Sequence, residues 1–374
     1  MNVAIIHDYL NQYGGAERVL EKLHELFPSA PVYTSIFDPA TMPPDYRRWD
    51  IRTSFMQRLP GVSRRHQMYL PFYPLAFEGF DLSAYDVVIS NSSAWCKGVM
   101  TGPTTLHLCY CLTPMRWVWN YREYVQRERF GPHIRMALPA MMNWLRSWDR
   151  VTADGVDHFA TISRTVAARV AKYYRRDSVI IYPPVETASF QVAESHDDYF
   201  LVVSRLVPYK RIDLVVEAFN RLGLPLLIVG DGRDRRVLEA RAKPNIKFLG
   251  KVPDAEVRRH YSRCRAFLFP GEEDFGITPV EAQACGRPVI AYAEGGALDT
   301  MVDGVTGKLF YPQTADALAE TVSSFDDGSF DPAAIRRNAE RFDTAHFKQD
   351  LLAFVEEKYR EHREATAPIT WGRG

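Results

Sequence analysis

The sequence has neither a net charge nor a long apolar run. Its 374 residues carry 46 Lys+Arg against 46 Asp+Glu, a balance that does not favour a nucleic-acid binder. The longest apolar stretch, residues 136–145, is too short to span a bilayer. Residues 1–10 are typical of a strand containing Asp8, and they lack the basic region and apolar core of a secretory signal. We therefore expect a cytoplasmic protein.

Two kinds of motif are also missing. The cysteines lack the spacing of zinc ligands, and we interpret them as buried free thiols in a reducing cytosol; they are Cys96, Cys109, Cys111, Cys264 and Cys285. The Gly-x-Gly-x-x-Gly of a dinucleotide-binding dehydrogenase does not follow the first strand, where only Gly14-Gly15 occurs. A dehydrogenase is therefore disfavoured.

Short β-branched runs alternate with helical stretches along the chain, a pattern that predicts parallel sheets with crossover helices. The chain is long enough for two such domains. A polar, acidic segment with Pro183-Pro184 separates the halves. We predict an N-terminal Rossmann-like domain over 1–182, a second over 183–344, and a final helix and tail over 345–374. The strands and helices on which this rests are expected at 3–6, 16–27, 32–36, 87–90, 106–111 and 159–162, and then at 200–204, 212–222, 226–229, 246–249, 255–263, 266–269, 278–285, 289–291 and 345–363.

Ligands of such domains bind at the carboxyl ends of the strands. After the strand at 200–204, Arg205 and Lys210 lie where a strand gives way to a helix and could grip an anionic group, although a solvated basic turn would look the same. Gly230-Asp231-Gly232 follows the next strand, and glycine there would let the backbone approach a ligand. Plain turn chemistry explains it equally well.

The loop after the strand at 266–269 carries a pair of acidic residues. Glu273 lies in the loop and Glu281 in the first part of the next helix, with Gly276 between them. The start of that helix offers free N–H groups to a diphosphate. Stabilisation of the helix dipole alone would explain Glu281, but not the whole loop. The three loops together predict one nucleotide-sugar pocket.

This pattern resembles the signature of the retaining GT-B glycosyltransferases with a Glu-x7-Glu motif, and Gly14-Gly15-Ala16-Glu17-Arg18 matches another landmark of that family. The N-terminal half is similar to the bacterial O-antigen and exopolysaccharide mannosyltransferases. The segments that carry this similarity are 70–74, 85–92 and 113–119. The resemblance covers nearly the whole chain. It implies two facing domains with a last helix that crosses back to the first.

The resemblance also implies roles for individual residues. Arg205 and Lys210 would neutralise the donor diphosphate, Glu281 would hold the ribose, and Glu273 would face the transferred sugar. The backbone from Phe275 through Gly276 to Ile277 would contact sugar and phosphate, and Gly15 would let the first domain close over the phosphates. The expected donor is GDP-mannose or another GDP-hexose, with UDP-hexoses open. The expected acceptor is a lipid-linked saccharide.

Catalysis of this kind stabilises the leaving diphosphate. Many sugar transferases use Mg²⁺ held by an Asp-x-Asp pair, and the sequence contains no such triplet. We therefore expect transfer without a metal ion and without a cofactor. Retention could proceed with the departing phosphate taking the acceptor's proton, or through Glu273 as a covalent nucleophile. We favour the first route.

On the acceptor side, one position departs from the family. Leu112 stands where a histidine usually precedes Thr-Pro, and leucine forms no side-chain hydrogen bond. Thr113 or Arg116 could substitute for it, or the acceptor chemistry is altered. The aromatic residues at 116–121 could line an acceptor cleft or belong to the core.

Residues 47–66 contain six arginines and one acidic residue, interleaved with Trp49, Phe55, Met56 and Leu59. Such a stretch suits a lipid-diphosphate acceptor or an anionic membrane surface, here the inner face of the cytoplasmic membrane. A solvated surface loop is the equal alternative. Among functions, a nucleotide-sugar epimerase and a non-catalytic sugar-nucleotide binder also remain open.

Overall fold

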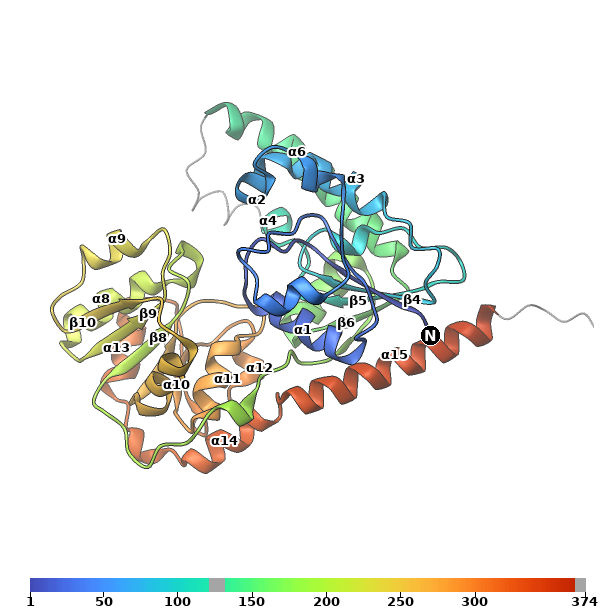
Figure 1. Cartoon of the computed structure of the whole chain (residues 1–374). Coiled ribbons are helices and arrows are strands. Elements are labelled where there is room, and N and C mark those ends of the chain that lie inside the picture. The colour runs from blue at the N-terminus through green and yellow to red at the C-terminus, as the bar shows by residue number, and fades with distance from the viewer. Residues whose placement is uncertain (121–131, 367–374) are drawn as a thin grey trace, which may run out of the picture. The chain divides into compact units, whose positions relative to one another are not determined.

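The computed structural model describes residues 1–120 and 132–366, with the side chains of 132–137 excepted. The chain forms two compact units (Figure 1). The first is Met1–Tyr182 together with the chain from Phe347 onward, and the second is Pro183–His346. We describe each unit by itself.

The first unit contains a seven-stranded parallel sheet in the order β3-β2-β1-β4-β5-β6-β7. Its strands are β1 (Val3–His7), β2 (Val32–Thr34), β3 (Ile51–Thr53), β4 (Val87–Ser92), β5 (Leu106–Cys111), β6 (His158–Thr161) and β7 (Ser178–Ile180). Every residue of β1, β4 and β5 is buried, as expected for strands with both faces covered. The helices are α1 (Gly15–Leu26), α2 (Val62–Arg65), α3 (Tyr73–Glu78), α4 (Arg116–Trp119), α6 (Pro132–Thr152) and α7 (Arg164–Arg169), and a π-helical turn over Val170–Tyr174 follows α7.

The second unit repeats the plan with a six-stranded parallel sheet in the order β10-β9-β8-β11-β12-β13. The strands are β8 (Phe200–Val203), β9 (Leu226–Val229), β10 (Ile246–Gly250), β11 (Ala266–Phe269), β12 (Val289–Tyr292) and β13 (Gly307–Phe310). The helices are α8 (Ile212–Leu222), α9 (Arg235–Glu239), α10 (Asp254–Arg263), α11 (Ile277–Ala284), α12 (Ala297–Thr300), α13 (Ala315–Ser323) and α14 (Pro332–Glu340). In chain order this sheet runs 3-2-1-4-5-6, the doubly wound arrangement, whose direction reverses between β8 and β11.

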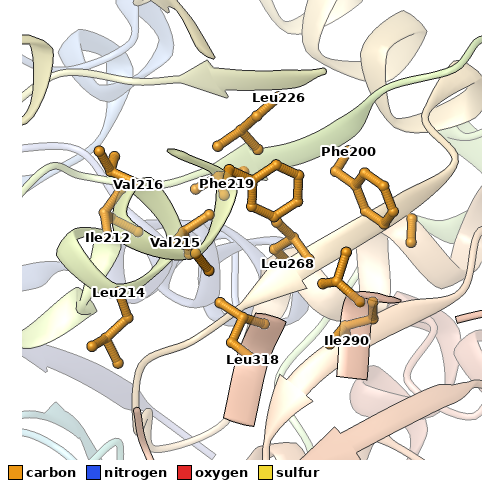
Figure 2. Packing of buried hydrophobic residues seen from close by; sticks show 14 of the residues in the cluster. Phe200, Ile212, Leu214, Val215, Val216, Phe219, Leu226, Leu268, Ile290 and Leu318 are labelled. Atoms are coloured by element: carbon orange, nitrogen blue, oxygen red, sulfur yellow. The ribbon is translucent and has the colours of Figure 1, made fainter. Parts of the chain in front are cut away.

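The core of the second unit lies between this sheet and the helices α8 and α13. Figure 2 shows Phe219 of α8 beside Phe200 of β8, their rings 5.2 Å apart and edge to face. Leu268 of β11 and Ile290 of β12 extend the same buried cluster, and Leu318 of α13 closes it. The apolar periodicity of 212–222 places the apolar side chains of α8 on one face of the helix. Burial of that face against the sheet determines how α8 packs.

The final helix, α15 (Thr344–Thr366), begins in the second unit and belongs to the first from Phe347 onward. The ring of Phe347 contacts Tyr110 of β5 at 5.6 Å, and Lys348 pairs with Glu25 of α1 at 2.6 Å. Asp343 begins the helix by accepting a hydrogen bond from the N–H of Ala345. A C-terminal helix that returns to the first unit was expected from the resemblance, and it starts one residue earlier than predicted.

Most predicted elements are present with shifts of one or two residues, and some were missed. The strand expected at 32–36 ends at Thr34, because Ile36 turns to accept a hydrogen bond from the N–H of Leu10. The sequence reading missed β3, β7 and β13, which are three or four residues long. Within the described residues, no helix is both long enough and apolar enough to cross a membrane. All five cysteines are buried and unpaired, as predicted.

The segment after Tyr182 was interpreted as a linker by composition, and it is firmly attached to the second unit. Arg287 donates hydrogen bonds to the carbonyls of Ala193 and Ser195. Arg336 does the same to the carbonyls of Thr187 and Phe190. The segment contains no regular strand. The two guanidinium groups therefore supply the hydrogen bonds that its backbone carbonyls would otherwise lack.

Candidate functional site

The predicted cationic loop follows β8 at the carboxyl edge of the second sheet. Arg205 is exposed and donates a hydrogen bond to the hydroxyl of Tyr209 at 3.0 Å. The ammonium of Lys210 lies over the Tyr209 ring, 5.3 Å from its centre. Tyr209 thus contacts both cationic side chains of the loop. Arg205 and Lys210, which the sequence predicts to bind an anion, therefore lie close together.

Glu273 joins them from the loop after β11. Its Oε1 forms an ion pair with the Lys210 ammonium, and the two side chains are 15% and 19% exposed. The loop of Lys210 follows β8 and that of Glu273 follows β11, so the pair lies where the strand order of the sheet reverses. In open parallel sheets this crevice is the usual ligand site.

Glycine permits a close approach of these loops. A Cβ on Gly271 would lie 3.1 Å from the carbonyl oxygen of Lys210, so the two loops touch through their backbones. Arg211 secures the contact from the other side: it donates to Gln313 at 2.9 Å, and Gln313 in turn donates to the carbonyl of Pro270 at 2.9 Å. Three loops of the sheet edge therefore hold the Lys210–Glu273 pair in place.

The start of α11 adds backbone donors. Gly276 precedes it with φ of +95°, and no side chain caps the helix. Its first N–H groups, beginning at Ile277, are therefore available to an anion. Phe275 is buried, and its ring contacts Phe342 at 5.4 Å. The buried aromatic side chain fixes the loop. A fixed loop is what the backbone of Phe275 would need in order to bind a ligand.

Glu281 lies inside α11, four residues after Ile277. It is buried, and its Oε2 accepts a hydrogen bond from the hydroxyl of Tyr261 in α10 at 2.9 Å. One carboxylate oxygen is therefore already used inside the unit. The role at the ribose stays a prediction.

The turn at Gly230 supports the cationic loop directly. A Cβ on Gly230 would lie 1.9 Å from the carbonyl oxygen of Ser204, and one on Gly232 would lie 2.2 Å from that of Leu206. The N–H of Leu206 also donates to the carbonyl of Asp231 at 2.9 Å. The glycines therefore allow two backbone segments to pack closely. This packing explains why glycine is needed at both positions, without a ligand.

Sequence reasoning missed the loop after β12. Gly295 and Gly296 lie against the Glu273–Phe275 backbone, and the Gly296 N–H donates to the carbonyl of Glu273 at 2.8 Å. A Cβ on Gly296 would come within 2.2 Å of Phe275. The rule that located the other loops, a glycine turn directly after a buried strand, would have found this one too.

Tyr292, at the end of β12, is a titratable group beside these loops whose pKa differs from its usual value. Burial, and then the charges of Glu294 and Glu272, raise its pKa to about 12. The phenol therefore stays protonated at neutral pH and cannot serve as a base.

The remaining predicted residues lie in the first unit. Gly15 opens α1 after Gly14, which precedes the helix in an extended conformation without a side-chain cap. Thr113 and Arg116 follow β5 at the carboxyl edge of the first sheet. The Thr113 hydroxyl donates to the carbonyl of Pro114. Leu112 is buried, and Tyr121 of the aromatic run lies outside the described residues.

The arginine-rich stretch is not one long loop. It contains β3, α2 and the 3₁₀ helix Phe55–Arg58. Arg52 is occupied by Asp50, Tyr33 and Tyr85, so it is not a free cation. Other side chains of the stretch are turned inward: Met56 is buried, and Trp49 stacks on His24 and Tyr46. The exposed members include Arg47, Arg48, Phe55, Arg58, Arg64 and Arg65.

Comparison with known proteins is consistent with this geometry. Residues 185–342 match the family model of the glycosyl transferases group 1. The chain is 26% identical to O-antigen chain mannosyltransferase C of Escherichia coli over 336 residues, covering 84% of this chain and 85% of that protein. It is also 26% identical, over 173 residues, to an uncharacterized glycosyltransferase of Methanocaldococcus jannaschii. That match covers 44% of this chain and about half of the relative's length, 48%.

Among solved structures, HepE of Anabaena in complex with UDP superposes with a TM-score of 0.72. It covers 96% of this chain and all of the other at 16% identity. At that identity the likeness concerns the fold. Residues 185–342 are therefore similar to the glycosyl transferases group 1, and the two parallel-sheet units of the chain have the GT-B fold.

Proposed function

We propose that the chain is a retaining glycosyltransferase that moves mannose from GDP-mannose to a lipid-linked saccharide in bacterial surface polysaccharide synthesis. The observation that carries the proposal is the Lys210–Glu273 ion pair between the loops after β8 and β11. The O-antigen chain mannosyltransferase of E. coli, aligned over 84% of this chain, favours a mannosyl donor. The UDP in the HepE structure makes UDP-hexoses the competing donors.

Transfer builds negative charge on the leaving diphosphate, and the loop after β8 carries the positive charges that stabilise it. Lys210 and Arg205 flank Tyr209 and present an ammonium and a guanidinium to the same space. The uncapped start of α11 adds N–H donors from the other side. Positive groups fixed before the reaction stabilise the charge as it develops, which is electrostatic catalysis.

Glu273 acts on the sugar rather than as a nucleophile. Its carboxylate is paired with Lys210, and an adjacent ammonium lowers the nucleophilicity of a carboxylate. When the diphosphate engages Lys210, a carboxylate oxygen becomes free to accept a sugar hydroxyl. Retention then proceeds on the front face, with the departing phosphate taking the acceptor's proton.

The Glu273→Gln variant distinguishes these roles. An amide keeps a hydrogen-bond acceptor but cannot form a glycosyl ester, so transfer should fall by a factor of about 10², at the low end of the range for one positioned group. A complete loss with a trapped glycosyl-enzyme in the wild type would support the covalent route. Near-normal turnover would remove Glu273 from both roles.

No metal ion takes part in this scheme. The sequence has no Asp-x-Asp triplet, and Arg205 and Lys210 take the role that Mg²⁺ has in many transferases. Turnover should be unchanged by EDTA and by added Mg²⁺. A rate that EDTA abolishes and Mg²⁺ restores would contradict this part of the proposal.

The decisive experiment is a thermal-shift screen with GDP-mannose, GDP-fucose, UDP-glucose and UDP-N-acetylglucosamine, followed by donor conversion with and without membrane lipid extract. The proposal predicts the largest stabilisation by GDP-mannose and GDP release that increases with extract. Conversion of the sugar without acceptor would indicate the epimerase. Binding of a donor without any GDP release would indicate a non-catalytic binder.

The acceptor implies contact with a membrane, and the segment 55–75 of the first unit has the chemistry for it. It contains no acidic residue. Its exposed face combines apolar side chains, among them Met68, 72% exposed, and Leu75, 59% exposed, with arginines. Its buried side chains Met56, Val62 and Tyr73 anchor it to the core. Such a face suits an anionic lipid surface.

Co-sedimentation with phosphatidylglycerol vesicles tests this face. The Arg64→Glu/Arg65→Glu variant should lose most of its binding, because each basic residue contributes about 1 kcal/mol at an anionic surface. An equal charge change at two exposed positions of the second unit, Arg241→Glu/Lys251→Glu, is the control and should bind as the wild type does. Equal binding by both variants would contradict the role of this face.

A further inference from the structure

A buried ion pair lies in the first unit, and neither of its residues has a role in the proposed donor site. The side chains of Lys97, just after β4, and Asp149 of α6 are 1% and 0% exposed and form a direct contact. The Lys97 ammonium also lies 5.4 Å from the Trp148 ring centre and 5.2 Å from that of Tyr174. Removing two charges from water costs more than their attraction usually returns, so the pair calls for an explanation beyond stability.

The explanation lies in what else the Asp149 carboxylate accepts. Its Oδ2 takes hydrogen bonds from Trp119 Nε1 at 2.6 Å and from the Tyr174 hydroxyl at 2.9 Å. Three donors therefore converge on one carboxylate from three different elements. We refer to Lys97, Asp149, Trp119 and Tyr174 as the Asp149 cluster.

The cluster is linked to the segment after β5. Trp119 ends α4 and stacks flat on Tyr173, with centres 4.3 Å apart and planes 7° from parallel. Arg146, one turn before Asp149 on α6, donates to the carbonyl of Val118 at 3.0 Å. The π-helical turn over Val170–Tyr174 lets consecutive tyrosines take part, one by stacking and the other by hydrogen bonding. The short helix α4 is thus held by its last two residues.

The segment held in this way is the one that follows β5 at the carboxyl edge of the first sheet, where doubly wound sheets bind ligands. It includes Thr113 and Arg116. A four-residue helix has too few internal hydrogen bonds to keep its own shape, so its geometry depends on α6 and the cluster. We propose that Lys97 and Asp149 are positioning residues that fix residues 113–120 for acceptor transfer. This inference rests on the proposed function.

Two variants separate positioning from stability. Trp119→Phe removes the N–H donor and keeps an aromatic ring, although a smaller one, for the stack on Tyr173. Lys97→Met/Asp149→Leu removes both charges together, which avoids an unpaired buried charge and can leave stability unchanged or higher. The control is Arg150→Met/Asp154→Leu, which removes an ion pair near the C-terminal end of the same helix, 35% and 61% exposed.

The first measurement is hydrogen exchange of the amides of Val118, Trp119 and Asn120, which bond to the carbonyls of Met115 and Arg116. The second is transfer from GDP-mannose to methyl α-mannoside, compared with hydrolysis of the same donor by water. In both variants the amides should exchange at least tenfold faster and the ratio of transfer to hydrolysis should fall at least tenfold. The donor KM should stay within twofold, because the donor groups lie in the second unit. The control variant should match the wild type in every measurement.

Unchanged exchange in both variants overturns the proposal, and so does faster exchange with an unchanged transfer ratio, which would leave the cluster a purely structural role. A wild-type protein that releases no nucleotide from any donor would contradict the proposed function instead. In that case the exchange rates alone decide whether the cluster holds residues 113–120.

Discussion

Lys210 is the residue whose loss should cost the reaction most. It pairs with Glu273 and lies over the ring of Tyr209, so it is held in one place before a diphosphate binds. Replacing it by alanine removes a positioned charge, worth about 3–4 kcal/mol in comparable sites. The kcat of Lys210→Ala should fall by a factor of about 10²–10³, measured as GDP release.

The control for that variant is Lys251→Ala, which removes an exposed lysine from the same unit. It should keep the wild-type kcat. A Lys210→Arg variant keeps the charge but not the compact ammonium, so partial activity there would show that charge is what the site needs. Full activity in Lys210→Ala would remove the residue from the mechanism.

Gly296 provides a test of the loop that the sequence reading missed. Its φ of −66° is one that any residue adopts, so an alanine meets only a steric obstacle, at 2.2 Å from the Phe275 backbone. Overpacking of this kind costs about 1–3 kcal/mol. Gly296→Ala should weaken nucleotide binding in a titration, while Gly102→Ala, where a Cβ would meet open space, should not. Equal affinities would show that the loop tolerates displacement.

At the scale of whole elements, a buried histidine in β5 makes the stability of the first unit depend on pH. Burial lowers the pKa of His107 from 6.5 to about 4. Between these values the unfolded chain binds a proton that the folded chain does not, so stability falls as the pH drops from 6.5 towards 4. The difference of about 2.5 pK units corresponds to about 3 kcal/mol. His107→Gln should be less sensitive to pH in urea unfolding.

Tryptophan fluorescence is the right probe for that experiment. Six of the seven tryptophans lie in residues 1–182, so the signal reports the unit that contains β5. His346→Gln, an exposed histidine of the second unit, is the control and should lose stability on acidification as the wild type does. The same pH dependence in His107→Gln would show that another group is responsible.

These elements also show what the sequence could and could not predict. The loops of Arg205, Lys210 and Glu273 were found because a loop after a buried parallel strand lies at one known edge of the sheet. The short strands β3, β7 and β13 were missed, because three or four residues give too little periodicity. The Lys97–Asp149 pair could not have been found, since nothing local marks two charges 52 residues apart as buried partners.

At the scale of the molecule, the last helix ties the end of the chain to the first unit. Phe347, 2% exposed, meets Tyr110 of β5 edge to face. A Phe→Ala change at such a site costs about 3 kcal/mol or more. Phe347→Ala should therefore lower the urea midpoint of the tryptophan signal. The matched control is Glu356→Ala, an exposed position of the same helix, with no expected change.

Arg205, Lys210 and Glu273, which we propose bind the donor, lie in the second unit, Pro183–His346. Nucleotide affinity in Phe347→Ala should therefore match that of the wild type at temperatures where the first unit is folded. Acceptor transfer should fall with the fraction of folded first unit, because residues 113–120 belong to it. Loss of nucleotide binding in step with the tryptophan signal would mean that the two units fold as one cooperative block. The proposed separation of donor binding and acceptor binding between the two units would then not extend to their stability.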